Sequence, residues 1–128
     1  MEKRTEEWFR QSDYDMDTAE YMHQGGRNIY AVFMCHLAVE KALKGLFYEK
    51  LRAVPPKTHN LVFLLNKIDL KPPESPGKFI IKLSEASIPT RYPEDLAKVQ
   101  QAYTESVVQD MLSRAKEVIT WIKGQHWT

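Results

Sequence analysis

The longest stretch with helical character runs from Asn28 to Glu49, and it limits how the rest of the chain can pack. It contains no proline and one glycine, Gly45. At about 100° per residue, its large apolar side chains gather on one broad arc. The opposite side is small, aromatic or sulfur-containing, with Lys41 as its only charge. Because a helix that is apolar or small nearly all round is enclosed on several sides, this segment is predicted to be the central helix, packed on its own chain and on a second copy.

Polar residues interrupt the apolar arc of this helix at intervals of four. His36 and Glu40 fall in its middle, and Lys44 lies at its edge. Asp15 falls in the inward stripe of the preceding predicted helix. An unpaired polar group in a core costs roughly 1–3 kcal/mol even when it is neutral, so these groups must pair with one another or with Arg91, or line a wet cleft. A satisfied network that fixes helix register and a ligand-lined cleft are both consistent with the pattern, and they do not exclude each other.

The rest of the chain predicts further helices and no strands, because nothing alternates with period two between turn residues. Gly25-Gly26 ends the first helix and makes it an antiparallel neighbour of the central one. Thr58 is the predicted N-cap of the first short helix. The predicted ranges are 5–24, 28–50 and 104–123 for the long helices, and 58–67 and 78–86 for the short ones. The fold class is therefore all-α, an up-and-down helical bundle of three long helices plus two short ones in a single domain over residues 1–128.

Composition restricts the classes of function. With 27% charged and 43% hydrophobic residues, the chain is globular rather than disordered. Its formal net charge of +1 provides no overall field that would attract nucleic acid or membranes, so a basic site has to be local. No apolar run approaches the roughly 20 residues that a membrane span requires. The lone Cys35 excludes an internal disulfide and, with no signal peptide, predicts a soluble protein of the reducing cytoplasm.

Arg91 and Tyr92 form a candidate phosphate and base site. They stand between two prolines in the segment 88–94, which is expected to be extended. Arginine binds phosphate bidentately, and tyrosine stacks on a base. The alternative is a buried anchor in which Arg91 pairs with an interior acid such as Asp15 or Glu40.

Lysines near the end of the central helix, Lys41 and Lys44 among them, add positive charge, although a solvated face or a helix C-terminus explains such a run without a ligand. A metal site is not predicted, because no second histidine follows His36 and Glu40 at helical spacing. Neither a nucleophile motif nor a phosphate-cradling glycine loop is present, and no cofactor is expected.

Several pieces of the sequence, in order, resemble the HEPN domain, a family of small helical nucleotide-binding proteins. They are Trp8 with Asp15 and Ala19, A-V-E-K-A-L-K-G-L at Ala38–Leu46, T-H-N-L at Thr58–Leu61, and T-R-Y-P at Thr90–Pro93. The match spans nearly the whole chain. The resemblance implies a bundle that dimerises through its long helices, with a cleft between protomers. It also implies a nucleotidyltransferase partner in a toxin–antitoxin-like or regulatory pair.

Some members of this family are metal-independent ribonucleases that use an arginine followed, after four to six residues, by a histidine on the late helices. The sequence departs from that motif, because no histidine follows Arg91 before His126 and Arg114 has none at this spacing. Arg52 and His59 have six residues between them but straddle a Pro-Pro loop, and we interpret their spacing as coincidental. If they did act together, Arg52 would stabilise the transition state while His59 moved the proton during 2′-hydroxyl attack.

The leading hypothesis is a homodimeric HEPN module, non-catalytic or regulatory, that binds nucleotide or RNA phosphate in a cleft between protomers and acts with a nucleotidyltransferase. The residues expected at that cleft are Asp15, His36, Glu40, Lys41, Lys44, Arg91 and Tyr92. A ribonuclease toxin of the same fold and a purely structural dimerisation module are the alternatives.

Overall fold

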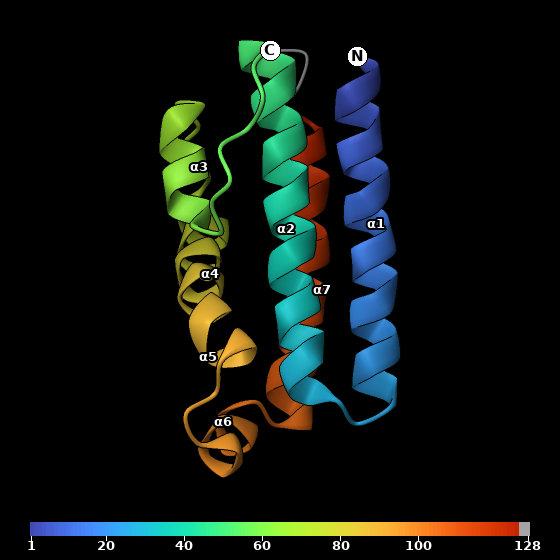
Figure 1. The fold of residues 1–128 in the computed structure, drawn as a ribbon, viewed down its shortest axis with the longest axis vertical. Coiled ribbons are helices and arrows are strands. Elements are labelled where there is room, and N and C mark those ends of the chain that lie inside the picture. The colour runs from blue at the N-terminus through green and yellow to red at the C-terminus, as the bar shows by residue number, and fades with distance from the viewer. Residues whose placement is uncertain (126–128) are drawn as a thin grey trace.

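Three long helices run side by side in the computed structural model, which describes residues 1–125 (Figure 1). They are α1 (Lys3–Gln24), α2 (Asn28–Leu51) and α7 (Glu105–Lys123). α2 packs against both of the others and runs antiparallel to α1, to which a short turn joins it. Residues 126–128, which include His126, lie outside the described range.

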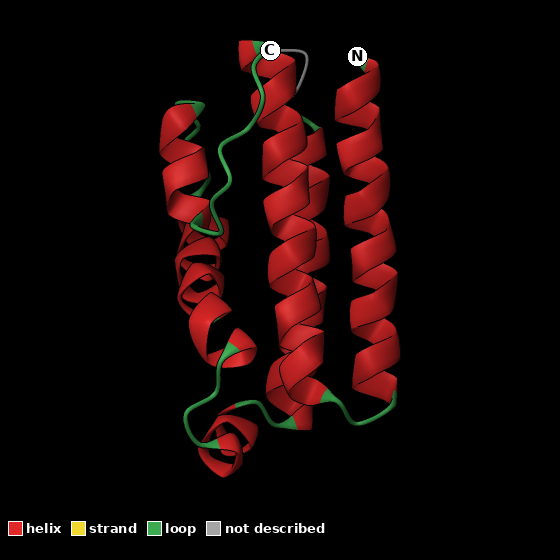
Figure 2. Cartoon of the chain, viewed as in Figure 1, coloured by secondary structure: helices red, strands yellow, loops and turns green. Residues whose placement is uncertain are grey.

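All regular structure in residues 1–125 is helical (Figure 2), so the predicted all-α up-and-down bundle is confirmed. The short helices in this range are four, whereas two were predicted. They are α3 (Leu61–Lys67), α4 (Glu74–Glu85), α5 (Ser87–Arg91) and α6 (Leu96–Ala102). α3, α4 and α5 follow one another along the side of α2 that lies opposite α1 (Figure 1). The loop and short helices that follow α2 therefore return along α2 itself.

Two features of the short helices differ from the prediction for physical reasons. The segment 88–94, expected to be extended, is helical through Arg91. Pro89 is tolerated there because it lies in the first turn of α5, where a backbone N–H has no partner within the helix. Asn60 rather than Thr58 caps α3, because the Asn60 side chain accepts a backbone N–H of the first turn at 3.0 Å.

α2 is enclosed on several sides, and its apolar side chains form the centre of the core. The fully or almost fully buried ones are Ala31, Val32, Cys35, Ala38, Val39, Ala42, Leu43, Leu46 and Phe47. α1 packs tightly against α2 at Gly45, where a Cβ would lie 2.9 Å from Phe9 Cε1 and 2.9 Å from Trp8 Cβ. The absence of a side chain at this position therefore allows Trp8 and Phe9 of α1 to pack directly against α2.

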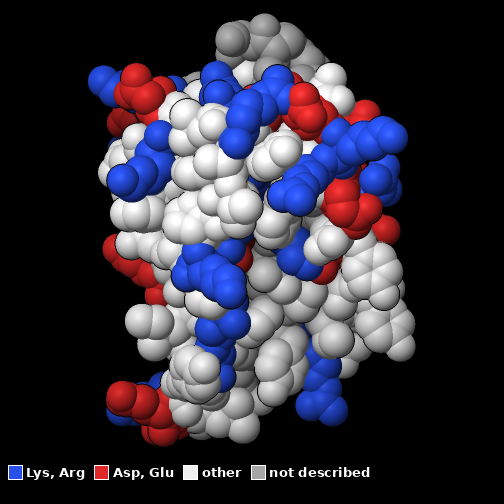
Figure 3. All heavy atoms as spheres, turned by 45° about the horizontal axis from the view of Figure 1, so that its top comes forward, with Lys and Arg blue, Asp and Glu red and all other residues white. Residues whose placement is uncertain are grey.

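On the face that Figure 3 shows, basic and acidic side chains are interspersed among larger uncharged areas, in agreement with the net charge of +1. None of the helices in the described part of the chain is long and apolar enough to cross a membrane.

Replacing Gly45 with alanine is predicted to lower the free energy of unfolding by about 1–3 kcal/mol, because the added methyl group overpacks a close helix contact. Urea denaturation measures this change. Gly25→Ala is the matched control, since its Cβ would come no closer than 3.5 Å to its nearest neighbour, Tyr21 O. Equal stability of the Gly45→Ala variant and the wild-type protein would contradict the described packing of α1 on α2.

Candidate functional site

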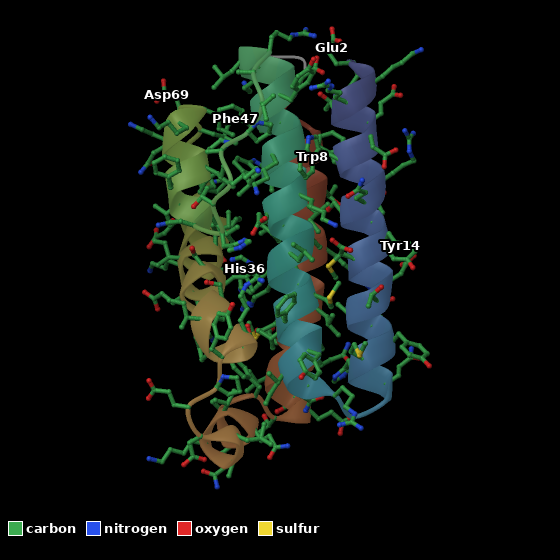
Figure 4. All side chains as sticks on the ribbon, in the orientation of Figure 1. Glu2, Trp8, Tyr14, His36, Phe47 and Asp69 are labelled. Carbon is green, nitrogen blue, oxygen red and sulfur yellow. The ribbon has the colours of Figure 1, made fainter. Side chains whose placement is uncertain are left out.

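The polar residues of α2 hold one loop residue, His59, at two points. His36 Nε2 donates a hydrogen bond to the backbone carbonyl of His59 at 2.9 Å. One turn further along α2, Glu40 Oε1 lies 2.8 Å from Nδ1 of the His59 ring. Lys44 Nζ donates to the other oxygen of Glu40 at 3.0 Å. The regular spacing of these three residues thus has a physical explanation: they fix both the backbone and the ring of His59 (Figure 4 shows His36 on the side of α2 that faces α4 and α5).

The bond to Glu40 determines which nitrogen of His59 is available. An ionised carboxylate only accepts hydrogen bonds, so we assign the ring hydrogen of His59 to Nδ1. Nε2 then carries a lone pair and points away from Glu40, on a side chain that is 55% exposed. Within residues 1–125 no hydrogen-bond partner is found for this Nε2. An accessible imidazole nitrogen held by a buried carboxylate can accept a hydrogen bond or transfer a proton.

Arg91, at the end of α5, lies beside His59. Its guanidinium carbon is 4.4 Å from the centroid of the Phe33 ring on α2, a cation–π contact. Its Nη2 is 3.4 Å from Nδ1 of His59, which already donates to Glu40, so this distance is a close approach rather than a second hydrogen bond. Phe33 therefore orients the guanidinium without neutralising it.

The interior acids are paired with lysines, not with Arg91. Asp15 Oδ2 lies 2.9 Å from Lys41 Nζ, and Glu40 is bound by Lys44 and His59. No ion pair joins Arg91 to an acid in the described chain, so the buried-anchor alternative is not observed. The positive charge of Arg91 remains uncompensated.

A cavity of about 400 Å³ opens where these groups meet. It is lined by His59, Asn60, Ser84, Ser87, Ile88, Arg91 and Tyr92. Tyr92 follows the last residue of α5, and 74% of it is exposed. The cavity thus combines a guanidinium, an imidazole, small hydroxyl side chains and an accessible aromatic ring, groups that can bind a phosphate and stack on a base.

The structure separates the residues that the sequence grouped together. Two of them, Arg91 and Tyr92, line the cavity. Three others lie on α2 and hold His59 in place, directly or through Glu40: His36, Glu40 and Lys44. Asp15 and Lys41 instead form an ion pair between α1 and α2, and neither lines the cavity.

Arg52, the arginine that precedes His59 at the spacing of the ribonuclease motif, is paired with acidic residues. It ends α2 in a left-handed conformation with φ of 52°. Its guanidinium binds Glu2 and lies 3.7 Å from Glu49 Oε2. Figure 4 shows Glu2 at the end of the bundle, well away from His36. Arg52 therefore has acidic partners of its own and no contact with His59 is found within residues 1–125.

Sequence reasoning missed that His59 and Arg91, 32 positions apart, are neighbours in space. The ribonuclease motif of the family places the histidine after the arginine, whereas the fold of this chain brings Arg91 next to a histidine that precedes it. The available signal was that both residues lie in short pieces, T-H-N-L and T-R-Y-P, that match the same family. Phe33, whose ring contacts the guanidinium, belongs to the apolar arc of the central helix, and nothing in the sequence pattern distinguishes it from the other apolar residues there.

His36 is 1% exposed, and burial lowers its pKa from the ordinary value of 6.5 to about 4, against a smaller opposing effect of the Glu40 carboxylate. The imidazole is therefore neutral at pH 7. A neutral ring agrees with its contacts, since Nε2–H donates to His59 while Nδ1 lies 3.8 Å from Glu40 Oε1. His36 holds the loop by a hydrogen bond and contributes no charge to the site.

Comparison with known proteins agrees with this architecture. The model of the HEPN domain family matches residues 5–125. This chain belongs to the HEPN family. A crystal structure of an archaeal HEPN homologue is 29% identical, with a TM-score of 0.77, over 98% of this chain and 99% of that one. A protein from Thermus thermophilus is 24% identical and shares the fold, with a TM-score of 0.80 over 96% of this chain and 98% of that one. No curated protein matches the chain.

The pKa of His36 predicts a pH dependence of stability. As the pH decreases, this imidazole takes up a proton near pH 6.5 in the unfolded chain. In the folded chain it takes up the proton only near pH 4. The folded state therefore binds fewer protons in this window, and the free energy of unfolding falls as the pH decreases through it, by up to about 3 kcal/mol. His36→Gln keeps an N–H donor but cannot titrate, so its free energy of unfolding should depend less on pH between 6.5 and 4. Parallel pH profiles of the two proteins, measured by urea denaturation, would refute the assignment.

Proposed function

We propose that this HEPN protein binds a phosphate group of a nucleotide or of RNA in the cavity bordered by His59, Arg91 and Tyr92. The observation that carries the proposal is the state of Arg91. Its guanidinium is oriented by Phe33, has no acidic partner in the described chain, and lies 3.4 Å from the ring of His59. A fixed, uncompensated guanidinium beside a second polar group is a suitable site for an oxyanion.

The buried charges behind the cavity support this function. Glu40 would repel a phosphate, but Lys44 Nζ lies 3.0 Å from its carboxylate and balances the charge. His36 is neutral at pH 7 and adds no charge. The positive charge of Arg91 is therefore not cancelled by His36, Glu40 and Lys44 together. Tyr92, which is largely exposed, is placed to stack on the base attached to the phosphate.

The proposal includes a homodimer and a nucleotidyltransferase partner, as the family resemblance implies. An exposed aromatic surface on α1 supports an assembly. Tyr14 and Tyr21 are two helical turns apart, so they share one face of α1, and they are 74% and 73% exposed. Figure 4 shows Tyr14 pointing away from the bundle. Tyrosines are enriched in protein interfaces.

Arg91→Ala is predicted to weaken the binding of adenosine 5′-monophosphate and of short single-stranded RNA by about tenfold or more, since a charge-assisted hydrogen bond contributes about 1.5–3 kcal/mol. Arg10→Ala is the matched control, because Arg10 lies on α1 and is paired with Glu7. Calorimetric titration at low salt measures both affinities. Absence of binding by the wild-type protein, or equal binding by the two variants, would contradict the proposal.

A ribonuclease activity is the second candidate, favoured by the outward Nε2 of His59 beside Arg91. In this reaction Nε2 takes the proton of an RNA 2′-hydroxyl, whose oxygen attacks the adjacent phosphorus. The P–O bond to the 5′-oxygen breaks, the leaving oxygen takes up a proton, and a 2′,3′-cyclic phosphate remains. Arg91 stabilises the negative charge that develops on the phosphate oxygens. The arginine in this role is Arg91 rather than Arg52.

The ribonuclease candidate predicts that expression of the wild-type protein arrests growth and that His59→Ala and Arg91→Ala relieve the arrest. Arg52→Ala should still arrest growth, because Arg52 is bound to Glu2 and Glu49. Cleaved RNA ending in 2′,3′-cyclic phosphate is the accompanying measurement. Harmless expression together with intact RNA in vitro excludes the ribonuclease candidate. If the wild-type protein also fails to bind nucleotide and RNA, the remaining hypothesis is the structural dimerisation module.

A further inference from the structure

A second cavity adjoins the proposed phosphate site. Its volume is about 340 Å³, and it lies between the start of α2 and the α5–α6 segment. Arg91 lines both cavities and is the side chain that they share. A ligand group held by Arg91 is therefore next to two separate spaces.

The second cavity has the surface that a nucleoside requires. Leu96 and the rings of Tyr30 and Tyr103 provide apolar and aromatic walls, while Gln100 provides an amide that can donate and accept. Burial raises the pKa of Tyr103, so its phenol remains protonated at neutral pH. Flat bases stack on such rings and hydrogen-bond through their edges.

The walls of this cavity are held together before any ligand binds. Asn28 Nδ2, in the first turn of α2, donates to the backbone carbonyl of Tyr103 at 3.1 Å. This bond joins the start of α2 to the end of α6 and keeps the two sides of the cavity at a fixed distance. A preformed site costs less free energy to occupy.

The charges around this cavity favour an anionic ligand. Arg27 also lines it, and within residues 1–125 neither Arg27 nor Arg91 forms an ion pair with an acid. In the cavity between α4 and α7, by contrast, the guanidinium of Arg114 is paired with Asp110 at 2.8 Å and Lys78 with Glu74 at 2.9 Å, although Lys82 adds a lysine for which no ion pair is found in residues 1–125. Two uncompensated guanidinium groups thus distinguish the cavity at the start of α2.

We propose that the cavity lined by Arg27, Tyr30, Leu96, Gln100 and Tyr103 is a nucleoside subsite. The ligand is then a phosphodiester with nucleosides on both sides, its phosphate on Arg91, one nucleoside in this subsite and the other beside Tyr92. This inference rests on the proposed phosphate site. It adds that a dinucleotide unit, rather than a lone phosphate group, fills the surface.

Two variants test the subsite with a dinucleoside monophosphate, adenylyl-3′,5′-adenosine, and with inorganic phosphate. Gln100→Ala removes the amide, and Leu96→Trp fills the cavity from a position that is 56% exposed. Each should weaken dinucleotide binding about tenfold and leave phosphate binding unchanged. Gln101→Ala, at the exposed neighbouring position on α6, should change neither. Circular dichroism of each variant checks its fold.

The outcomes separate this inference from the proposed function. If Arg91→Ala weakens both ligands while Gln100→Ala and Leu96→Trp bind the dinucleotide like the wild-type protein, the phosphate site stands and the subsite is wrong. If the wild-type protein binds neither ligand, the proposed function and the subsite both fail.

Discussion

The structure depends on how the buried carboxylate of Glu40 is compensated. This side chain is 3% exposed, and an isolated charge at such a position would be strongly unfavourable. Lys44 satisfies one oxygen and the ring of His59 the other. The second bond requires the loop after α2 to return along the helix, where His36 holds it again through the carbonyl of His59. Stability and the geometry of the candidate site thus arise from the same contacts.

The acids inside the bundle are paired with lysines, so the positive charge of Arg91 remains available at the surface. With Glu40 bound to Lys44 and Asp15 bound to Lys41, the interior acids do not neutralise Arg91. Phe33 contacts the guanidinium but carries no charge, so it orients Arg91 while leaving its N–H groups able to bind an anion. Binding and cleavage differ here only in whether the exposed nitrogen of His59 also moves a proton, which explains why one set of residues supports both candidates.

The sequence was sufficient for the long helices and for the polar positions of α2, because both follow from periodicity. The 3.6-residue pattern identifies α7, and the interruption of an apolar arc identifies His36 and Glu40. It was not sufficient for the proximity of Arg91 to His59, since this depends on the path of the chain through α3, α4 and α5. Local rules also failed at Pro89, which the first turn of a helix tolerates as readily as an extended segment does. The sequence left open whether the polar residues form a paired network or line a cleft, and the structure contains both. The buried acids Asp15 and Glu40 are paired with lysines, whereas Arg91 and Tyr92 line an accessible cavity.

The central claim is that Glu40 holds His59 with Nε2 facing an open phosphate site. Long-range ¹H–¹⁵N NMR of the histidine rings, recorded at pH 8 where an ordinary imidazole is neutral, tests it most directly. The account predicts that His59 carries its hydrogen on Nδ1 and that its Nε2 resonance shifts when adenosine 5′-monophosphate is added. A hydrogen on Nε2, or ring resonances that do not change at millimolar nucleotide, would contradict the account.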